Sequence, residues 1–413
     1  MRTPLTSPAP ASEARTGAAP RRPLLVEALG LERNIVAVSG AMFLMGLGEN
    51  LWRRFLPKYL EALGAPVAAI GLFGSTQDFL DGVYQYPGGW VADRFGRRRA
   101  LLLFVALAMA GYALFLVAPT WRWVFAGLAL AMAWTSMASP ALFAVVGDAL
   151  PKERRTMGFT VQSVLRRVPI AAAPTLGGLA IAAYGVRSGV RLGLAVSIAL
   201  AAATLVVVAR VRIPLVADEA PTDIRGVWRS LPTPLRRLLF SDVFIRTCEG
   251  MVDVFLVLYA INVVGISAPQ FGALVAVQAV TSILSYFPAA RLADRTGRKP
   301  FVIATFVAFS LFPLAVVLAQ SLAGLVAAFV VGGLRELGEP ARKALIVDLS
   351  RPGLRARSIG LYYLVRSVAI APAAFVGGLL WRVAPSVPFY VAAAVGAVGV
   401  AVFAATVDEA HAG

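Results

Sequence analysis

The stretch GGWVADRFGRRRA, residues 88–100, returns as ARLADRTGRKP at residues 290–300, about 200 positions later. Residues in several other parts of the chain match at the same offset. They are Glu49, Phe55 and Tyr59 with Glu249, Phe255 and Tyr259; Pro140 and Asp148 with Pro340 and Asp348; and Arg166, Gly177 and Gly178 with Arg366, Gly377 and Gly378. A series of matches in one register predicts a chain built from two similar halves.

The composition of the chain is that of a protein embedded in a lipid bilayer. Of its 413 residues, 59% are hydrophobic and only 15% are charged, whereas about a quarter of the residues in soluble domains are charged. Apolar runs of about 20 residues, the length that a helix needs to cross a bilayer, recur along the whole sequence. We therefore predict an all-α membrane protein with twelve membrane-spanning helices, at residues 35–62, 66–90, 100–118, 122–148, 155–184, 190–210, 238–262, 268–290, 300–319, 321–348, 356–382 and 386–406.

The predicted spans form two six-helix halves, at residues 35–212 and 238–406, joined by a linker at 213–237. Two halves around a central site are the plan of many secondary transporters. Residues 1–34 are rich in Pro, Ala, Ser, Thr and Arg, and no apolar run precedes Ile35. They predict a disordered tail rather than a cleaved signal peptide, and residues 407–413 form a second tail.

The net charge of +17 comes mostly from arginines in the connections between apolar runs, not from one soluble basic face. We therefore do not expect nucleic-acid binding. The positive-inside rule places both termini and the linker in the cytoplasm. The bias toward Arg, Ala and Gly points to a bacterial source, so we expect a monomer that crosses the bacterial cytoplasmic membrane many times.

The sequence lacks the residues of common enzyme and metal sites. Its single cysteine, Cys248, lies in an apolar run, and its single histidine, His411, lies in the C-terminal tail. A His/Cys metal site and a histidine proton relay are therefore not expected. Because the sequence has no GxxxxGK[ST] loop, ATP is not the expected energy source. We expect no cofactor and no enzymatic activity.

The two copies at 88–100 and 290–299 resemble the loop signature of the major facilitator superfamily, G-x-L-A-D-R-x-G-R-K/R. The resemblance covers about residues 35–406 and implies a twelve-helix transporter that works by alternating access. In that family, the loop and a carboxylate at the end of the fourth span form a clasp that holds the halves together on the cytoplasmic side. The matching residues form the conformational gate that we expect: Gly89, Asp93, Arg94, Gly96 and Arg97 with Asp148 and Arg155, and Asp294, Arg295, Gly297 and Arg298 with Asp348 and Arg355. The alternative is a basic loop that only sets the orientation in the membrane.

The stretch APTLGG, residues 173–178, resembles the antiporter signature G-P-x-x-G-G of the same family. Pro174, Gly177 and Gly178 match, whereas Ala173 replaces the first glycine. The match favours an exporter. The alternative is that these glycines serve only the close packing of helices.

Ionisable residues at mid-depth occur in spans one, two, five, seven, ten and eleven, which are therefore predicted to surround a central cavity rather than face lipid. Asp78 and Asp81 share a helix face, as do Glu249 and Asp253. Two neighbouring carboxylates disfavour double ionisation, which suits proton coupling.

The alternative for the charged residues is that they form fixed ion pairs. Glu49 lies four residues from Arg53, and Arg246 lies three residues from Glu249. Both spacings place the two side chains on one helix face. Glu339 has three expected partners within four residues of it in the sequence, namely Arg335, Arg342 and Lys343.

We predict a secondary transporter that exports a small organic compound by proton-coupled antiport. The predicted substrate and proton pathway consists of Glu49, Arg53, Gln77, Asp78, Asp81, Trp134, Arg166, Arg246, Glu249, Asp253, Gln278, Arg335, Glu336, Glu339 and Arg366. One alternative is an importer or uniporter of an anionic metabolite that uses Arg166, Arg335 and Arg366. A more distant alternative is a membrane receptor or scramblase that transports no solute.

Overall fold

The chain forms a bundle of helices in the computed structural model, which describes residues 33–138, 152–210, 228–229, 231–350 and 355–407. Within these ranges, the N-terminal half contains α2 (Arg33–Trp52), η1 (Arg53–Phe55), α3 (Leu56–Ala62), α4 (Val67–Phe95), α5 (Arg97–Val117), α6 (Trp121–Met132), the π-helical turn η2 (Ala133–Met137) and α8 (Lys152–Ala209). The C-terminal half contains α10 (Thr233–Val252), η3 (Asp253–Phe255), α11 (Leu256–Leu258), η4 (Tyr259–Val263), α12 (Ala268–Thr296), α13 (Lys299–Leu318), α14 (Leu322–Leu334), α15 (Glu339–Asp348), α16 (Arg355–Ile370), α17 (Ala373–Trp381) and α18 (Val387–Thr406).

These elements follow the twelve predicted spans, so the all-α membrane fold with two six-helix halves is confirmed. α8 holds two spans, which are separated at Gly185, where the backbone φ is 77°. Six of the described helices are long and apolar enough to cross a bilayer. The other spans are interrupted by turns or carry polar residues at mid-depth.

The second span is longer than the apolar pattern indicated. α4 runs to Phe95, so Asp93 and Arg94 belong to its last turn, and only Gly96 separates it from α5. The signature stretch is therefore the end of a helix followed by a one-residue turn, rather than an extended loop.

The apolar pattern predicted one continuous helix for the tenth span and one for the eleventh. In the structure, each of these two spans is interrupted. The tenth span unwinds at residues 335–338, between α14 and α15. There the backbone N–H of Gly338 donates to Thr305 Oγ1 at 2.5 Å, so a contact with α13 replaces a helical hydrogen bond. The eleventh span breaks at Pro372, which has no backbone N–H to continue the helix.

The sequence repeat is visible in the backbone. Tight 3₁₀ turns occur at Arg53–Phe55 and Asp253–Phe255, which are equivalent positions of the two halves. The signature stretches turn at glycines with positive φ, 85° at Gly96 and 99° at Gly297. Because this region of backbone space favours glycine, the repeated glycine of the two signature stretches is explained by the turn that it forms.

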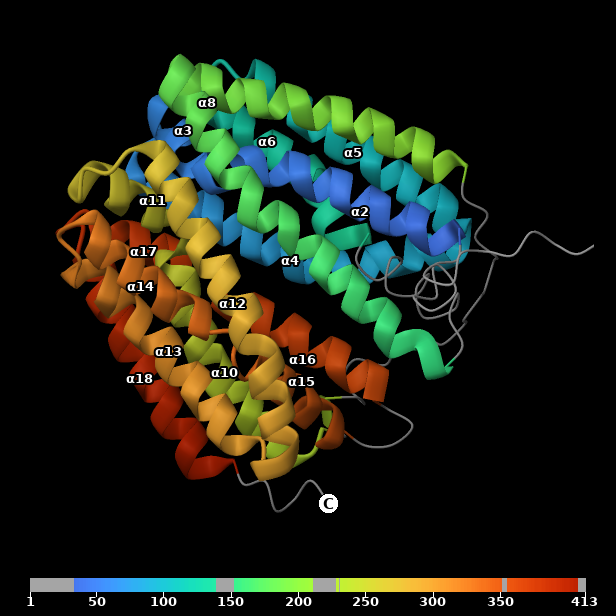
Figure 1. Cartoon of the computed structure of the whole chain (residues 1–413), viewed down its shortest axis with the longest axis vertical. Helices are drawn as coiled ribbons and strands as arrows, with labels where there is room; N and C mark the ends of the chain where they lie inside the picture. Colours follow the sequence, from blue (N-terminus) through green and yellow to red (C-terminus); the bar gives the residue numbers. More distant parts are fainter. Residues whose placement is uncertain (1–32, 139–151, 211–227, 230, 351–354, 408–413) are drawn as a thin grey trace, which may run out of the picture.

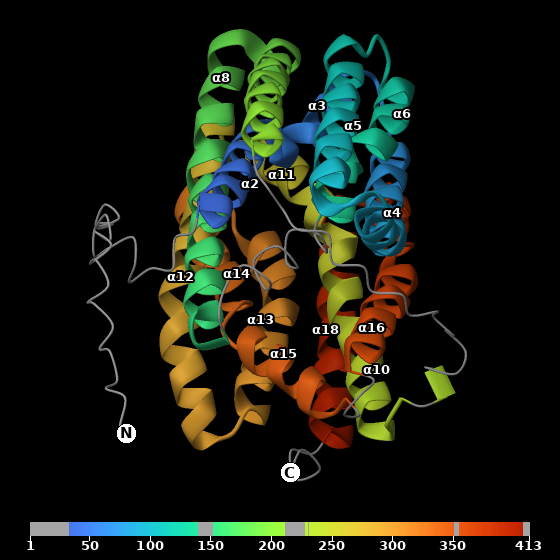
Figure 2. The same cartoon turned by 90° about the vertical axis from the view of Figure 1, so that its right-hand side faces the viewer.

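The two halves lie close together at one end of the molecule and apart at the other (Figures 1 and 2). We call the end that holds α3, α11 and α17 the closed end. We call the opposite end, where Gly96 and Gly297 are followed by arginines, the basic end. The protein is therefore in a conformation that opens toward the basic end.

Glycines let the backbones of the two halves touch at the closed end. A Cβ atom added to Gly178 of α8 would lie 2.5 Å from the carbonyl oxygen of Ala268, where α12 begins. On the other side of the molecule, a Cβ atom added to Gly71 of α4 would lie 2.5 Å from the carbonyl oxygen of Ala374 in α17. Neither helix pair can approach this closely with a larger residue at the contact.

The repeated glycine doublets divide their contacts in the same way. Gly177 packs against Leu51 within the N-terminal half, whereas Gly178 packs against the opposite half. In the C-terminal half, Gly377 likewise packs against α10 of its own half and Gly378 against α4 of the other. One glycine of each doublet therefore serves the fold of a half, and the second serves the contact between the halves.

Polar side chains also join the halves at the closed end. Asn262 Nδ2 donates to Glu61 Oε1 at 2.7 Å, and Lys58 Nζ donates to Asn262 Oδ1. Nearer the middle of the molecule, Arg54 Nη1 lies 3.2 Å from Asp253 Oδ1. The closed end is thus held by ionic contacts as well as by backbone packing.

We expect Gly178→Ala to shift the protein toward states in which the closed end is open, because the added Cβ atom meets the α12 backbone. Spin labels at Tyr184→Cys and Val263→Cys, in a Cys248→Ser background, report this separation by double electron–electron resonance. The label distance should lengthen. Gly40→Ala, whose added Cβ atom has no neighbour within 4 Å, is the matched control and should leave the distance distribution unchanged. Identical distributions for both variants would show that the α8–α12 contact does not hold this end closed.

Candidate functional site

Charged side chains at mid-depth face the region between the halves. Asp253, Arg53 and Arg54 keep 43%, 36% and 33% of their side-chain surface exposed. Since charged groups cannot cheaply face lipid tails at this depth, exposure of this size indicates that they line the region that opens toward the basic end. We call the side chains of Glu49, Arg53, Asp78, Asp81, Glu249 and Asp253 the central polar surface.

Glu49 forms the local ion pair that its spacing predicts. Its Oε1 atom accepts from Arg53 Nη1 at 2.8 Å and from Thr135 Oγ1 at 3.1 Å. Thr135 lies in η2, where the last turn of α6 widens into a π-helix, a feature that is frequent at functional sites. The carboxylate of Glu49 is therefore balanced within the N-terminal half.

Asp78 and Asp81 on α4 have different surroundings. Asp81 Oδ1 accepts a hydrogen bond from Ser136 Oγ at 2.6 Å. Asp78 makes no hydrogen bond or ion pair with any other residue that the structure describes, and it contacts α10 of the opposite half. A Cβ atom added to Gly250 there would lie 3.4 Å from Asp78 Oδ2. Within the described part of the chain, Asp78 is the acid of the central polar surface that has neither an arginine nor a hydroxyl partner.

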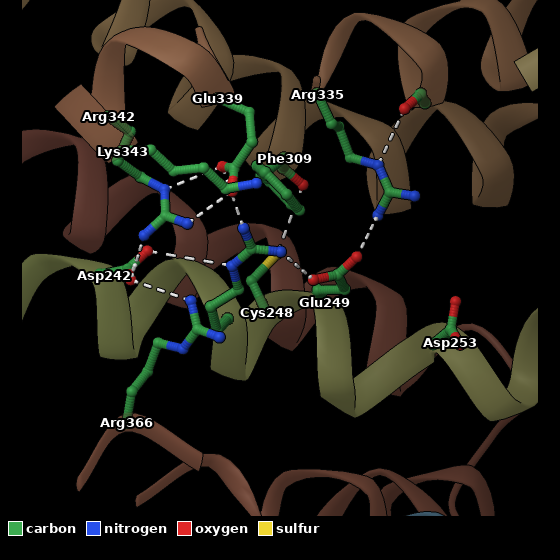
Figure 3. A network of polar contacts seen from close by, with 12 residues as sticks. Asp242, Cys248, Glu249, Asp253, Phe309, Arg335, Glu339, Arg342, Lys343 and Arg366 are labelled. Atoms are coloured by element: carbon green, nitrogen blue, oxygen red, sulfur yellow. Dashed lines mark hydrogen bonds and ion pairs between the residues drawn. The ribbon is translucent and has the colours of Figure 1, made fainter. Parts of the chain in front are cut away.

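Glu249 is held by two arginines of its own half (Figure 3). Arg246 Nη1 lies 2.8 Å from Glu249 Oε2, and Arg335 Nη1 lies 3.3 Å from Oε1. The predicted pair of Arg246 and Glu249 is thus confirmed. The guanidinium of Arg335 also lies over the ring of Phe312, 4.4 Å from its centroid, which is a cation–π contact. The unwound residues 335–338 place Arg335 in this position.

A second group of charges lies deeper in the C-terminal half (Figure 3). Arg342 binds both Glu339 and Asp242 at 2.7 Å. Tyr362 Oη donates to Asp242 Oδ2 at 3.0 Å, and Arg366 Nη1 lies 3.4 Å from the same oxygen. Because Asp242 is fully buried and Arg342 is 1% exposed, their charges are balanced inside the protein rather than by solvent.

Arg246 joins the two groups into one network. Its Nη1 atom binds Glu249, and its Nη2 atom lies 3.3 Å from Glu339 Oε2. Of the expected partners of Glu339, Arg342 and Lys343 are confirmed, the latter at 3.7 Å. Arg335 is not a partner, because the helix unwinds between residues 335 and 339 and their side chains no longer share a face.

The predicted acid pair of Glu249 and Asp253 is separated in the structure. Glu249 faces arginines of its own half, while Asp253 faces Arg54 of the opposite half. The backbone N–H of Asp253 still donates to the carbonyl oxygen of Glu249, so the two side chains differ in their ion-pair partners rather than in helical spacing. The two acids therefore do not share a proton site.

Trp134, which was predicted to belong to the solute pathway, lies in the π-helical turn η2. It is 6% exposed and packs in the main hydrophobic core. Gln77 of α4 and Gln278 of α12 are half-buried at matched positions of the two halves. Their place in a solute pathway is still a prediction.

Arg167, which the sequence pattern did not single out, joins the halves at mid-depth. Its Nη2 atom lies 3.5 Å from Glu336 Oε2, and its guanidinium lies 5.1 Å from the ring centroid of Tyr286. Glu336 is thus a contact between the halves. The side chain of the predicted Arg166 lies outside the described residues.

The ion pairs of Asp242 and Arg54 were not predicted from the sequence. Asp242 precedes Arg246 by four residues, and this spacing was a signal that could have identified it. Arg54 offered no such signal, because its partner Asp253 is distant in sequence and on the opposite half.

The predicted gate residues lie at the basic end. Arg94 and Arg295 are exposed, and Gly89 lies within α4. Arg298 pairs with Asp348, but this contact lies within the C-terminal half. It does not form the expected clasp between the halves, which are apart at this end. Outside the described residues lie the side chains of Asp93, Asp294, Arg155 and Arg355 and the whole of Asp148.

The described residues offer charge compensation and hydrogen bonding rather than covalent chemistry. Within the described ranges, no group of three or more His, Cys, Asp or Glu residues is arranged to hold a metal ion. Cys248 is buried, and its thiol donates to the carbonyl oxygen of Phe309. The described charged residues thus gather at mid-depth, partly within each half and partly where the two halves meet.

Known proteins resemble this chain over nearly its whole length. The family model of the Major Facilitator Superfamily matches residues 38–259 and 238–412. An uncharacterized MFS-type transporter of Methanocaldococcus jannaschii is 21% identical over 373 residues, which cover 87% of this chain and 91% of the relative. The multidrug resistance protein MdtG of Enterobacter lignolyticus is 25% identical over 286 residues, which cover 67% of this chain and 68% of the relative.

Solved transporter structures share the fold. The nucleoside transporter NupG superposes with a TM-score of 0.76 at 13% identity, covering 91% of this chain and 100% of NupG. The human organic anion transporter MFSD10 superposes with a TM-score of 0.64 at 17% identity, covering 90% of this chain and 99% of MFSD10.

We expect Asp242→Ala to destabilise the protein by about 3–5 kcal/mol, because it leaves buried Arg342 without one of its carboxylates. Thermal unfolding in detergent measures the loss. Asp348→Ala, which breaks the exposed pair with Arg298, is the control and should cost at most about 1 kcal/mol. Equal losses for the two variants would contradict a central structural role for Asp242.

Proposed function

The chain belongs to the Major Facilitator Superfamily of membrane transporters, and we propose that it exports a small organic solute in exchange for protons by alternating access. The observation that carries the proposal is Asp78, an acid without a partner among the described residues at the contact between the halves. Export is supported by two relatives that are named multidrug resistance protein, from Enterobacter lignolyticus and Citrobacter koseri. The glycine doublet of the antiporter-like stretch lies at the contact that such a cycle must open and close.

Asp78 has the surroundings that a coupling proton requires. A carboxylate beside an arginine stays ionised, whereas one that faces other acids can hold a proton. The acids within electrostatic reach of Asp78 are Asp81 of its own helix and Glu249 and Asp253 of the opposite half, while the cation within reach is Arg53. Since Arg53 already binds an acid of its own helix, Asp78 is the acid that we assign to proton exchange.

Proton exchange at Asp78 acts directly on the contact between the halves. Asp78 belongs to α4 and Asp253 to the opposite half, and both lie where the helices meet. An ionised Asp78 repels Asp253 across this contact, so release of the proton favours separation of the halves at the closed end. Protonation favours the conformation that is open toward the basic end.

The orientation of the protein in the membrane follows from its arginines. We place the basic end and both termini in the cytoplasm of a bacterium, in accord with the positive-inside rule. In this orientation, the structure is open to the cytoplasm, where an exporter must take up its solute. The proton enters from the outer side in the alternate state and is released to the cytoplasm from Asp78.

We expect Asp78→Asn to abolish coupling between proton flux and solute flux while leaving exchange of labelled for unlabelled solute intact, because an amide cannot carry the proton. Purified protein in liposomes, with a pH-sensitive dye inside, measures proton flux when solute is added. Asp81→Asn is the matched control, since it changes a neighbouring acid that has a hydroxyl partner, and it should stay coupled. Proton flux that persists in Asp78→Asn contradicts the assignment. Solute transport that ignores a pH gradient in the unaltered protein indicates a uniporter instead.

A further inference from the structure

The buried network of the C-terminal half carries more positive than negative charge. Four arginines share three carboxylates, and each arginine is at most 17% exposed. The arginines are Arg246, Arg335, Arg342 and Arg366, and the carboxylates are Asp242, Glu249 and Glu339. Lys343 is not included in this sum, because it is 57% exposed. The described network therefore has a net charge of one positive unit, which is costly in the interior of a membrane protein.

Arg366 is the arginine of this network whose positive charge is least compensated by nearby carboxylates. Its one ion pair in the described network is the 3.4 Å contact with Asp242 Oδ2, an oxygen that already accepts from Arg342 at 2.7 Å and Tyr362 at 3.0 Å. The Nε atom of Arg366 is buried and has no hydrogen-bond partner among the described residues. Figure 3 shows Arg366 reaching into the network from a different helix than Arg342. The surplus positive charge therefore lies at Arg366.

Arg366 is placed where a solute between the halves can reach it. It keeps 17% of its side-chain surface exposed, and the next residue, Ser367, contacts Gly82 of α4 in the opposite half. The guanidinium also lies 4.7 Å from the ring centroid of Tyr363, which fixes its orientation. A planar guanidinium held in this way binds carboxylate or phosphate groups through two parallel hydrogen bonds.

Two of the four arginines have no counterpart in the other half. The positions of the N-terminal half that match Arg246 and Arg335 hold Gly46 and Thr135, and Glu49 there is balanced by a single arginine. The repeated fold therefore does not itself require arginines at these two positions, whereas Arg366 has the counterpart Arg166, whose side chain lies outside the described residues.

We propose that Arg366 binds an oxyanion group, a carboxylate or a phosphate, of the transported solute. The solute would neutralise the surplus charge of the network when it enters between the halves. This inference rests on the proposed function in one respect, namely that the bound anion is part of the cargo. Binding itself is independent of the proton exchange assigned to Asp78.

The test uses the purified full-length protein and small anions as probes. Sodium acetate and inorganic phosphate are titrated at constant ionic strength against sodium chloride, and thermal unfolding is followed. We expect acetate, phosphate or both to raise the unfolding temperature in a saturable manner, and acetamide, the neutral analogue of acetate, to have no effect. The stronger of the two anions identifies the group as a carboxylate or a phosphate.

Variants of the network decide whether the anion binds at Arg366. Arg366→Gln should weaken the apparent affinity by about tenfold or more, since a hydrogen bond between charged groups is lost, and Arg366→Lys should retain part of the response. Lys343→Gln, which removes an exposed cation of the same region, should respond as the unaltered protein does. An equal response in Arg366→Gln, or no saturable response to either anion, would overturn the proposal. In the unaltered protein, proton exchange without a saturable anion response refutes this inference alone, whereas anion binding without proton exchange refutes only the coupling mechanism.

Discussion

The structure depends on one constraint, that charge inside a membrane-spanning bundle must be balanced within the protein. The C-terminal half meets most of this requirement with a dense network, in which Arg246 links Glu249 to Glu339 and Arg342 links Glu339 to Asp242, and one surplus positive charge is left at Arg366. The N-terminal half uses fewer charges and two hydroxyl groups. In the proposed cycle, the acid that exchanges its proton belongs to the half whose described mid-depth acids have fewer arginine partners.

The contact between the halves combines two kinds of interaction with different behaviour. Glycine contacts such as that of Gly178 with Ala268 are short-ranged and depend on shape, so they are either made or lost. The ionic contacts of Arg54 and Arg167 act over longer distances and respond to nearby charge. Asp78 lies against α10 of the opposite half, so the proton exchange that we propose for it acts on this same contact.

Local spacing and the repeat predicted much of this arrangement. The apolar runs and the repeat predicted the spans and the two halves, and spacings of three or four residues predicted the pairs of Glu49 with Arg53 and of Arg246 with Glu249. Contacts between distant segments could not be predicted in this way. The unwinding at residues 335–338 depends on a hydroxyl of α13, and the pair of Arg54 with Asp253 depends on how the halves meet. Both follow from packing, which a single sequence does not display.

The one-residue turn at Gly96 has a consequence for the surrounding lipids. Because only this residue joins α4 to α5, α5 must follow every tilt of α4, although its apolar sequence places it against the bilayer. Each transport cycle therefore displaces lipid as well as protein. The work that this displacement requires depends on the thickness of the bilayer, so the membrane around the protein contributes to the free energy of its conformational change.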